Sequence, residues 1–138
     1  MDLIEENSVA AVVYYKNEYL LLKYGLGHWE YAKGHMEKEE TEKETIMREL
    51  EEETGIKEAS IIEGFNEKYD YVFTSKGKKI HKFVSCYLIK SNTRDVTLSF
   101  EHVGYKWLSF QKAIKQLTYA NAKKILKKAH NFRLLTSV

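Results

Sequence analysis

Residues 34–56 read GHMEKEETEKETIMRELEEETGI, and this stretch predicts a loop followed by one helix. Thr41 can cap the start of the helix, because Glu44 follows three residues later and can reach back to the cap as in a capping box. Gly55 can end the helix, since glycine tolerates the left-handed conformation that commonly closes one. The sequence therefore predicts a helix between these two boundaries.

Three glutamates form a stripe along one edge of this helix. At about 100° per residue, Ile46 and Leu50 point into the core. The stripe beside them consists of Glu49, Glu52 and Glu53. Like charges three and four residues apart repel each other unless a positive charge lies among them. A hard divalent cation such as Mg²⁺ would supply that charge, although a solvated amphipathic helix is the alternative for an isolated Glu-rich stretch.

The length and composition of the chain fit one globular domain. The chain has 138 residues, of which 43% are hydrophobic and 30% charged, so we expect a single domain over residues 1–138. The formal net charge of +2 gives no general case for a nucleic-acid binder. Acidic residues concentrate in 37–53 and lysines in 76–82 and 112–128, which suits a metal site facing phosphate.

Cys86 is the single cysteine of the chain, so it cannot form an internal disulfide. Its apolar surroundings predict a buried, unreactive thiol in a reducing compartment. The first residues lack the pattern of a signal peptide, and no apolar run is long enough to span a bilayer. We therefore expect a cytoplasmic protein with no membrane partner.

The remaining sequence predicts strands and a helical tail. Val-, Leu- and Tyr-rich runs separated by turn residues predict two hairpins and one further strand, at 8–15 with 19–24, 59–71 with 79–90, and 103–108. In the tail, apolar residues recur at helical spacing at Ala122, Ile125, Leu126, Ala129 and Leu134. This order of elements predicts a mixed sheet with helices on both faces.

The glutamate helix also carries a family signature. The residues Gly34, Glu40, Arg48-Glu49-Leu50, Glu52-Glu53 and Gly55-Ile56 match the pattern G-x5-E-x7-R-E-U-x-E-E-x-G-U at every fixed position. At average residue usage such a match at one site has a chance of about one in 10⁹. The chain thus resembles the Nudix hydrolases, which implies an α+β or α/β fold with a mixed β-sheet between α-helices, an α/β/α sandwich.

The resemblance also implies roles for residues of the box. Metal ligands for Mg²⁺ or Mn²⁺ would be Glu49, Glu52, Glu53 and the carbonyl of Gly34. Arg48 and Glu40 would form an ion pair that holds the helix and the preceding loop in register, and a box glutamate would help to deprotonate the attacking water. The implied reaction is hydrolysis of a pyrophosphate bond in a nucleotide polyphosphate.

Three further segments resemble one group within that family, the asymmetric diadenosine tetraphosphate hydrolases. They are HWEYAKGHME at 28–37, IIEGFNEKYDYVF at 61–73 and SFEHVGYKWLSFQKA at 99–113. This likeness implies cleavage to ATP and AMP, with Glu101 as an additional metal ligand or general base. The chain departs from the group at Ala32, where proline is usual, and at Lys38-Glu39, where Pro-Gly is common.

Several side chains are candidates for binding the substrate. Basic side chains that could reach the polyphosphate are Lys33 and His35 beside Gly34, and Lys79, His81 and Lys82 in the second hairpin. Aromatic side chains that could stack on adenine are Tyr69, Tyr71 and Tyr87. A plain surface or packing role is the alternative for each. Trp29 and Trp107 are assigned to packing, and His28 and His102 remain undecided.

Other functions stay open at this point. Another Nudix substrate is one alternative: a nucleoside triphosphate, a sugar nucleotide or the 5′ end of an RNA. A nonenzymatic nucleotide-binding module is a second, although no box residue is degenerate. The Lys-rich tail raises nucleic-acid binding, but the even charge balance argues against a stable nucleic-acid partner. The sequence leaves the oligomeric state open.

Overall fold

The computed structural model describes residues 3–138. Along the chain the elements are β1 (Leu3–Tyr15), β2 (Glu18–Tyr24), β3 (Trp29–Glu30), β4 (Ala32–His35), α1 (Glu42–Thr54), β5 (Ala59–Ser75), β6 (Lys78–Ser91), β7 (His102–Leu108), α2 (Phe110–Gln116) and α3 (Ala120–Thr136). None of these helices is long and apolar enough to cross a membrane.

Strand β1 is the centre of a mixed sheet. On one edge it pairs in parallel with β6 from Leu3 to Tyr14. On the other edge it pairs antiparallel first with β4, over Ser8–Ala11, and then with β2 at Tyr14 and Tyr15. The sheet order is β3-β2-β1-β6-β5, with β7 added to β2. This position explains the continuous buried run at residues 9–14, because a central strand is covered on both faces.

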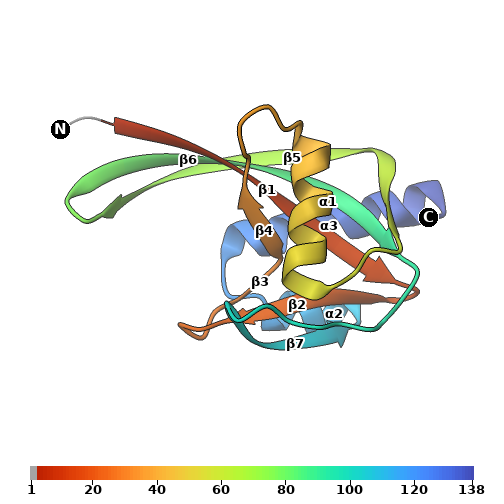
Figure 1. Cartoon of the computed structure of the whole chain (residues 1–138). Helices are drawn as coiled ribbons and strands as arrows, with labels where there is room; N and C mark the ends of the chain where they lie inside the picture. The colour runs from red at the N-terminus through yellow and green to blue at the C-terminus, as the bar shows by residue number, and fades with distance from the viewer. Residues whose placement is uncertain (1–2) are drawn as a thin grey trace.

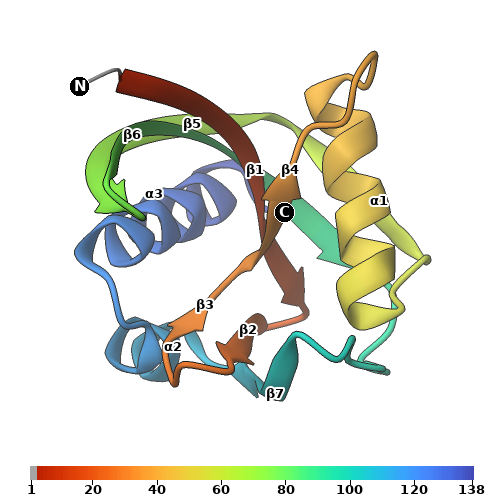
Figure 2. The same cartoon turned by 60° about the vertical axis from the view of Figure 1, so that its left-hand side comes forward.

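Helices cover both faces of the sheet, as the sequence predicted. Alternate β1 residues point to opposite faces, so Ala10 and Val12 join a core cluster with α2 and α3. Val9 and Ala11 join a second cluster with α1. Figures 1 and 2 show α1 on one side of the sheet and α3 on the other. The α/β/α layering is therefore confirmed.

Both predicted hairpins are present. The first turns at Lys16 and Asn17 between β1 and β2, and the second turns at Lys76 and Gly77 between β5 and β6. The second hairpin is longer than predicted and, together with the start of β1, projects beyond the helices (Figure 1). Its length matters for the site, because the pocket described below lies along it.

The tail contains two helices, and one of the apolar residues expected on its buried face is exposed instead. Ala122, Ile125, Leu126 and Ala129 are buried, whereas Leu134 is 68% exposed. Twelve residues advance a helix by about 120° beyond whole turns, so Leu134 has rotated away from the face that starts at Ala122. Cys86 is buried in the same core as predicted, and burial raises the pKa of its thiol to about 12.

Helix α1 begins and ends where the sequence predicted. The Thr41 hydroxyl accepts from the Glu44 backbone N–H at 3.1 Å, and the Glu44 carboxylate accepts from the Thr41 N–H at 2.9 Å. At the other end Gly55 has a φ of 72°, and its N–H donates to the Glu51 carbonyl. The caps fix the length of α1 and thereby the place of its glutamates.

We expect Thr41→Ala to lower the free energy of unfolding by about 1 kcal/mol, because it removes the hydroxyl half of the capping box. Thr41→Ser keeps the hydroxyl and is the matched control, with a smaller loss. Urea unfolding followed by circular dichroism measures both. Equal losses in the two variants would contradict a capping role.

Candidate functional site

The three glutamates of the α1 stripe differ in how deeply they are buried. Glu53 is 4% exposed, whereas the side chains of Glu49 and Glu52 are 16% and 58% exposed. The Lys33 backbone N–H donates to Glu53 Oε1 at 2.9 Å. His102 Nε2 lies 3.4 Å from Glu53 Oε2. The deepest carboxylate of the stripe is thus held against strand β4 and the start of β7.

Arg48 ties the loop before α1 to the helix. Its Nε donates to Glu40 Oε2 at 2.6 Å and its Nη2 donates to Glu40 Oε1 at 2.9 Å, so the guanidinium grips the carboxylate with both prongs. Nη2 also reaches the His35 carbonyl at 3.3 Å. The hydrogen bonds from Arg48 hold the pKa of Glu40 at about 2. The ion pair expected from the sequence is present.

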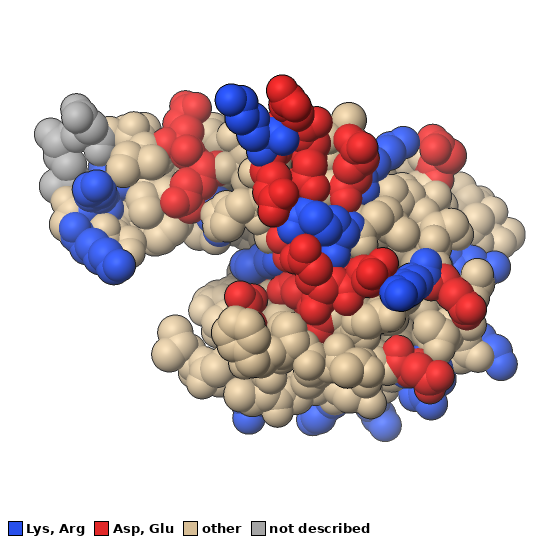
Figure 3. Space-filling model, in the orientation of Figure 1, with Lys and Arg blue, Asp and Glu red and all other residues tan. Residues whose placement is uncertain are grey.

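Arg48 also places positive charge among the stripe glutamates. Its Nη1 lies 3.0 Å from Glu49 Oε1 and 3.2 Å from Glu52 Oε2. Figure 3 shows the same arrangement on the surface, with basic side chains in the middle of an acidic cluster. The arginine therefore offsets part of the repulsion within the stripe, on its exposed side.

Gly34 lies so close to the Glu49 side chain that any Cβ there would have to displace the Glu49 carboxylate. A Cβ built on Gly34 would be 2.6 Å from Glu49 Cγ and would overlap the carboxyl carbon. Strand β4 holds Gly34 in place by pairing it with Val9 of β1. The glycine of the signature thus leaves room for a glutamate to lie across the backbone of the loop.

Negative charge accumulates on the buried side of the stripe. Burial raises the pKa of Glu53 to about 8, and the neighbouring carboxylates of Glu49 and Glu101 add to that rise. Burial also raises the pKa of Glu49. Tyr24 has a pKa raised mainly by burial, with further contributions from Glu53, Glu30, Glu101 and Glu49. Carboxylates from three separate segments therefore act electrostatically on Tyr24.

This cluster fits a divalent cation chemically. Its donors are carboxylate oxygens, and burial disfavours the ionised forms of Glu49 and Glu53 unless positive charge is added. As the side chains of residues 3–138 lie, no group of three or more His, Cys, Asp or Glu residues is arranged to hold a metal ion. Arg48 occupies the space between Glu49 and Glu52, so a cation on the exposed side would compete with its Nη1.

A pocket of about 510 Å³ opens next to the cluster, beneath the projecting hairpin, where Figure 3 shows a hollow. Its lining comes from five segments of the chain and consists of His28, Glu30, Lys33, Tyr69, Tyr71, Tyr119, Ala120 and Asn121. Lys33 joins the pocket to the carboxylates, since its N–H holds Glu53 and its Nζ lies 3.7 Å from Glu30. Aromatic walls beside a cationic and an acidic group suit a nucleotide.

Some of the predicted substrate residues lie at this pocket. Lys33, Tyr69 and Tyr71 line it. Lys82 is close to Lys33, and burial together with that neighbouring charge lowers the pKa of Lys82. His35 lies beside the ion pair instead, because its carbonyl accepts from Arg48 and its ring approaches Ser8.

Other predicted substrate residues lie elsewhere. The Tyr87 hydroxyl donates to Glu42 at 2.6 Å, within the core under α1. His81 pairs with Asp70 at 2.7 Å and stacks on Phe83. Along β6 these two residues and Lys79 have the opposite parity to Lys82, so they belong to the other face of the strand. The structure therefore places Tyr87, His81 and Lys79 away from the pocket that Tyr69 and Tyr71 line.

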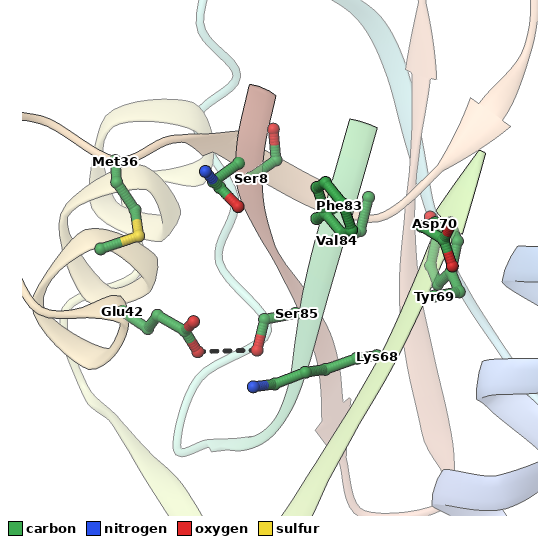
Figure 4. A pocket seen from close by; sticks show the side chains of 10 residues that line it. Ser8, Met36, Glu42, Lys68, Tyr69, Asp70, Phe83, Val84 and Ser85 are labelled. Carbon is green, nitrogen blue, oxygen red and sulfur yellow. Dashed lines mark hydrogen bonds between the residues drawn. The ribbon is translucent and has the colours of Figure 1, made fainter. Parts of the chain in front are cut away.

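A smaller cavity of about 250 Å³ lies on that other face, between the start of α1 and strands β5 and β6. Figure 4 shows Glu42 pointing toward Ser85, whose hydroxyl donates to it at 2.7 Å, with Met36 and Lys68 at the rim. The stripe glutamates line neither cavity, but Lys33 of the larger pocket donates its N–H to Glu53, and among residues 3–138 no such link is present at the smaller one. We therefore place the functional site at the larger pocket.

The sequence does not predict a site role for Glu30 or Tyr119, and it leaves the roles of His28 and His102 undecided. Glu30 is 3% exposed and accepts from the Tyr31 N–H. In the sequence it stands between two aromatic residues, and that position could have indicated a buried acid. Tyr119 lies between α2 and α3, where nothing in the local sequence indicates a pocket. Trp107 is buried in a core cluster, and Trp29 packs against the other one, as assigned.

Comparison with known proteins identifies relatives of similar length. A family model described as the NUDIX domain matches residues 5–129. The asymmetrical bis(5′-nucleosyl)-tetraphosphatase of Mus musculus is 35% identical over 119 residues, covering 83% of this chain and 80% of the relative. Its Caenorhabditis elegans counterpart is 38% identical over 122 residues, covering 85% and 86%.

The fold comparison agrees with the sequence comparison. A crystal structure of a C. elegans Ap4A hydrolase binary complex superposes with a TM-score of 0.83 at 34% identity. The match covers 96% of this chain and 99% of that one. The two chains are therefore similar from end to end.

We expect Gly34→Ala to weaken Mn²⁺ binding at least tenfold, on the order of one displaced ligand, because the new methyl group must push the Glu49 carboxylate aside. Gly25→Ala is the matched control, since open space surrounds Gly25. Electron paramagnetic resonance titration of Mn²⁺ measures binding, and circular dichroism checks the fold. Unchanged affinity in Gly34→Ala would separate Glu49 from metal binding.

We expect metal-free protein to lose stability as the pH rises from about 5 to 8. The folded-state pKa of Glu53 is about 8, above its ordinary value, so folding favours the protonated acid. That contribution is complete below the ordinary pKa near 4.5 and is lost as the pH rises through 8. Glu53→Gln removes it, so the variant should have a flatter dependence of melting temperature on pH.

The exposed Glu52→Gln is the matched control and should keep the slope of the unmodified protein. Thermal unfolding in a chelator at pH 5, 6.5 and 8 gives the three slopes. A Glu53→Gln slope equal to that of the other two proteins would show that Glu53 does not carry the dependence.

Proposed function

Because this chain is a Nudix hydrolase, we propose that it cleaves diadenosine tetraphosphate asymmetrically to ATP and AMP, with Mg²⁺ or Mn²⁺ at the α1 glutamates. The observation that carries the proposal is the pocket with aromatic walls, whose lining residue Lys33 is hydrogen-bonded to Glu53 of α1. Relatives named for this reaction share at least 34% of their residues with most of this chain, which supports the substrate class.

The metal would be held by carboxylates of the α1 stripe and by one from the segment before β7. We assign Glu49, Glu52, Glu53 and the Gly34 carbonyl as ligands, with Glu101 contributing from the segment before β7. A bound divalent cation supplies positive charge that acidifies water and offsets charge on phosphate oxygens. The raised pKa of Glu53 is consistent with this role, because added positive charge lets the buried carboxyl ionise.

The protein side chains would hold the reacting groups in place. The Lys33 N–H fixes Glu53 Oε1, and Arg48 fixes the loop that carries Gly34 through its grip on Glu40. The proton of the attacking water would pass to a carboxylate of the cluster, either Glu101 or a box glutamate. Water oxygen then joins one phosphorus as the bridging P–O bond breaks, and the products are ATP and AMP.

The pocket would hold one nucleoside end and its phosphates. A volume of about 510 Å³ accommodates a nucleoside, within the range of small-molecule sites. We assign Tyr69, Tyr71 and Tyr119 to the adenine, because flat aromatic faces stack on a base. Lys33 and Lys82 would face the polyphosphate. A nucleotide substrate of this kind and a free thiol at Cys86 suit work in the cytoplasm.

Product analysis tests the proposal. With Mg²⁺, diadenosine tetraphosphate should give ATP and AMP in equal amounts, and a chelator should abolish turnover. In water enriched in ¹⁸O, the label should appear in one product only, which identifies the phosphorus attacked. A panel of nucleoside triphosphates, sugar nucleotides and 5′-triphosphorylated RNA runs beside it. Faster release of products from one of these compounds would replace the substrate assignment while leaving the hydrolase chemistry intact.

We expect Glu53→Gln to lower kcat by several orders of magnitude, on the order of losing metal-assisted activation of water, with the fold retained. Glu51→Gln is the matched control, because Glu51 is an exposed residue of the same helix. Chromatographic assay of ATP and AMP gives both rates. Near-normal turnover in Glu53→Gln would overturn the assignment of the metal site.

A further inference from the structure

His102 is buried where the segment before β7 meets the end of α1. The segment is fastened to the helix by backbone bonds: the Thr97 N–H donates to the Thr54 carbonyl at 2.9 Å, and the Ser99 N–H donates to the Glu53 carbonyl at 3.1 Å. The His102 N–H in turn donates to the Ser99 carbonyl at 3.2 Å. These bonds fix the imidazole beside Glu53, and its side chain is fully buried.

The two ring nitrogens of His102 have different surroundings. Nδ1 lies 3.2 Å from the Ser99 hydroxyl oxygen. Nε2 faces Glu53 Oε2 at 3.4 Å and, among residues 3–138, has no hydrogen-bond partner. The ring of Tyr24 packs edge-on against the imidazole, with centroids 4.5 Å apart. The imidazole is therefore held in orientation, with Nε2 beside the Glu53 carboxylate but not hydrogen-bonded to it in this conformation.

These neighbours select one tautomer. An ionised carboxylate only accepts hydrogen bonds, so a favourable contact with Glu53 requires the proton on Nε2. Nδ1 then carries the lone pair, and the Ser99 hydroxyl can donate to it. In the other tautomer two lone pairs would face each other across the contact between Nε2 and Glu53. A buried polar atom without a partner is costly, which favours the first arrangement.

We propose that His102 is a positioning residue that donates from Nε2 to Glu53 Oε2 and so fixes the carboxylate for the metal. Metal ligands are commonly oriented by such outer contacts, and losing one costs 10–100-fold in metal affinity or activity. His102 directly follows Glu101, so the contacts that fix His102 also fix the backbone position of Glu101. The inference rests on the proposed metal site and adds the group that orients its deepest ligand.

Two variants of similar size separate the two ring nitrogens. His102→Gln can place its side-chain nitrogen near the position of Nε2 and keep the donor toward Glu53. His102→Asn is shorter, so its amide replaces Nδ1 and leaves the Glu53 side without a donor. Both variants lose the aromatic contact with Tyr24, so a loss of packing alone would affect them alike.

Mn²⁺ titration followed by electron paramagnetic resonance, without nucleotide, is the first measurement. We expect His102→Asn to weaken Mn²⁺ binding about 10-fold or more, and His102→Gln to stay within about 3-fold of the unmodified protein, in line with losses of outer contacts. Equal affinities in both variants and the unmodified protein would overturn the proposal. Equal weakening in both would also overturn it, because it would point to packing alone.

Steady-state kinetics provide the second measurement. At saturating Mg²⁺, His102→Asn should lower kcat about 10-fold or more while KM for the nucleotide changes little, because the pocket that binds the nucleotide is intact. A rise in KM without loss of kcat would contradict a role through Glu53.

A third measurement reads the tautomer directly. Long-range ¹H–¹⁵N spectra of Mg²⁺-loaded protein should show the His102 proton on Nε2, and a proton on Nδ1 would refute the proposal. These outcomes distinguish failure of the proposed function from failure of the role of His102. If the unmodified protein binds no Mn²⁺, the proposed function fails; if it binds Mn²⁺ and the two variants do not differ, the role of His102 fails alone.

Discussion

The burial of the Glu53 carboxylate is the constraint on which the rest of the site depends. A buried carboxyl group is costly when ionised, and Glu49 and Glu101 add negative charge beside it. The fold meets that cost with directed contacts, since the Lys33 N–H approaches one oxygen and His102 the other. Those contacts come from β4, which pairs with β1, and from β7, which pairs with β2 on the same side of β1. They require α1 to lie across the sheet at one depth and one rotation.

The ion pair of Arg48 and Glu40 holds that rotation from the exposed side. The guanidinium is gripped by Glu40 on the loop, while its remaining nitrogen faces Glu49 and Glu52. Arginine is suited to this task, because its planar fork stays charged and makes paired bonds that a lysine does not make. The same guanidinium compensates part of the stripe's repulsion without filling its buried side, where Glu53 lies.

Local features of this fold could be predicted from the sequence, and features set across strands could not. The caps of α1, its glutamate stripe and the two hairpins depend on residues close together in the chain, so spacing alone was sufficient. The positions of Glu30, Tyr119 and His102 depend on segments that meet only in three dimensions. The grouping of His81 with Lys82 conflicts with strand geometry, because adjacent residues of a strand point to opposite faces.

The different positions of Tyr71 and Tyr87 follow from the strand register. Tyr71 reaches the pocket and Tyr87 does not, although both lie in the same hairpin. The pairing of β5 with β6 is continuous from Asn66 and Tyr87 to the turn, and in it Tyr71 lies opposite Lys82, which has the opposite parity to Tyr87 along β6. A shift of one residue reverses the face on which a side chain lies, and no local pattern in the sequence reports it.

The loop before α1 shows how the chain manages without the prolines usual in its group. Glu39 has a φ of 72°, the left-handed conformation suited to a glycine, in a turn closed by the Glu40 N–H donating to the Glu37 carbonyl. The Glu40 carboxylate, already gripped by Arg48, also accepts from the Glu37 N–H at 2.9 Å. Side-chain bonds thus supply the order that Pro-Gly would build into the backbone. Ala32 is ordered differently, by pairing with Ala11 in the sheet, so both departures leave the metal-facing residues in place.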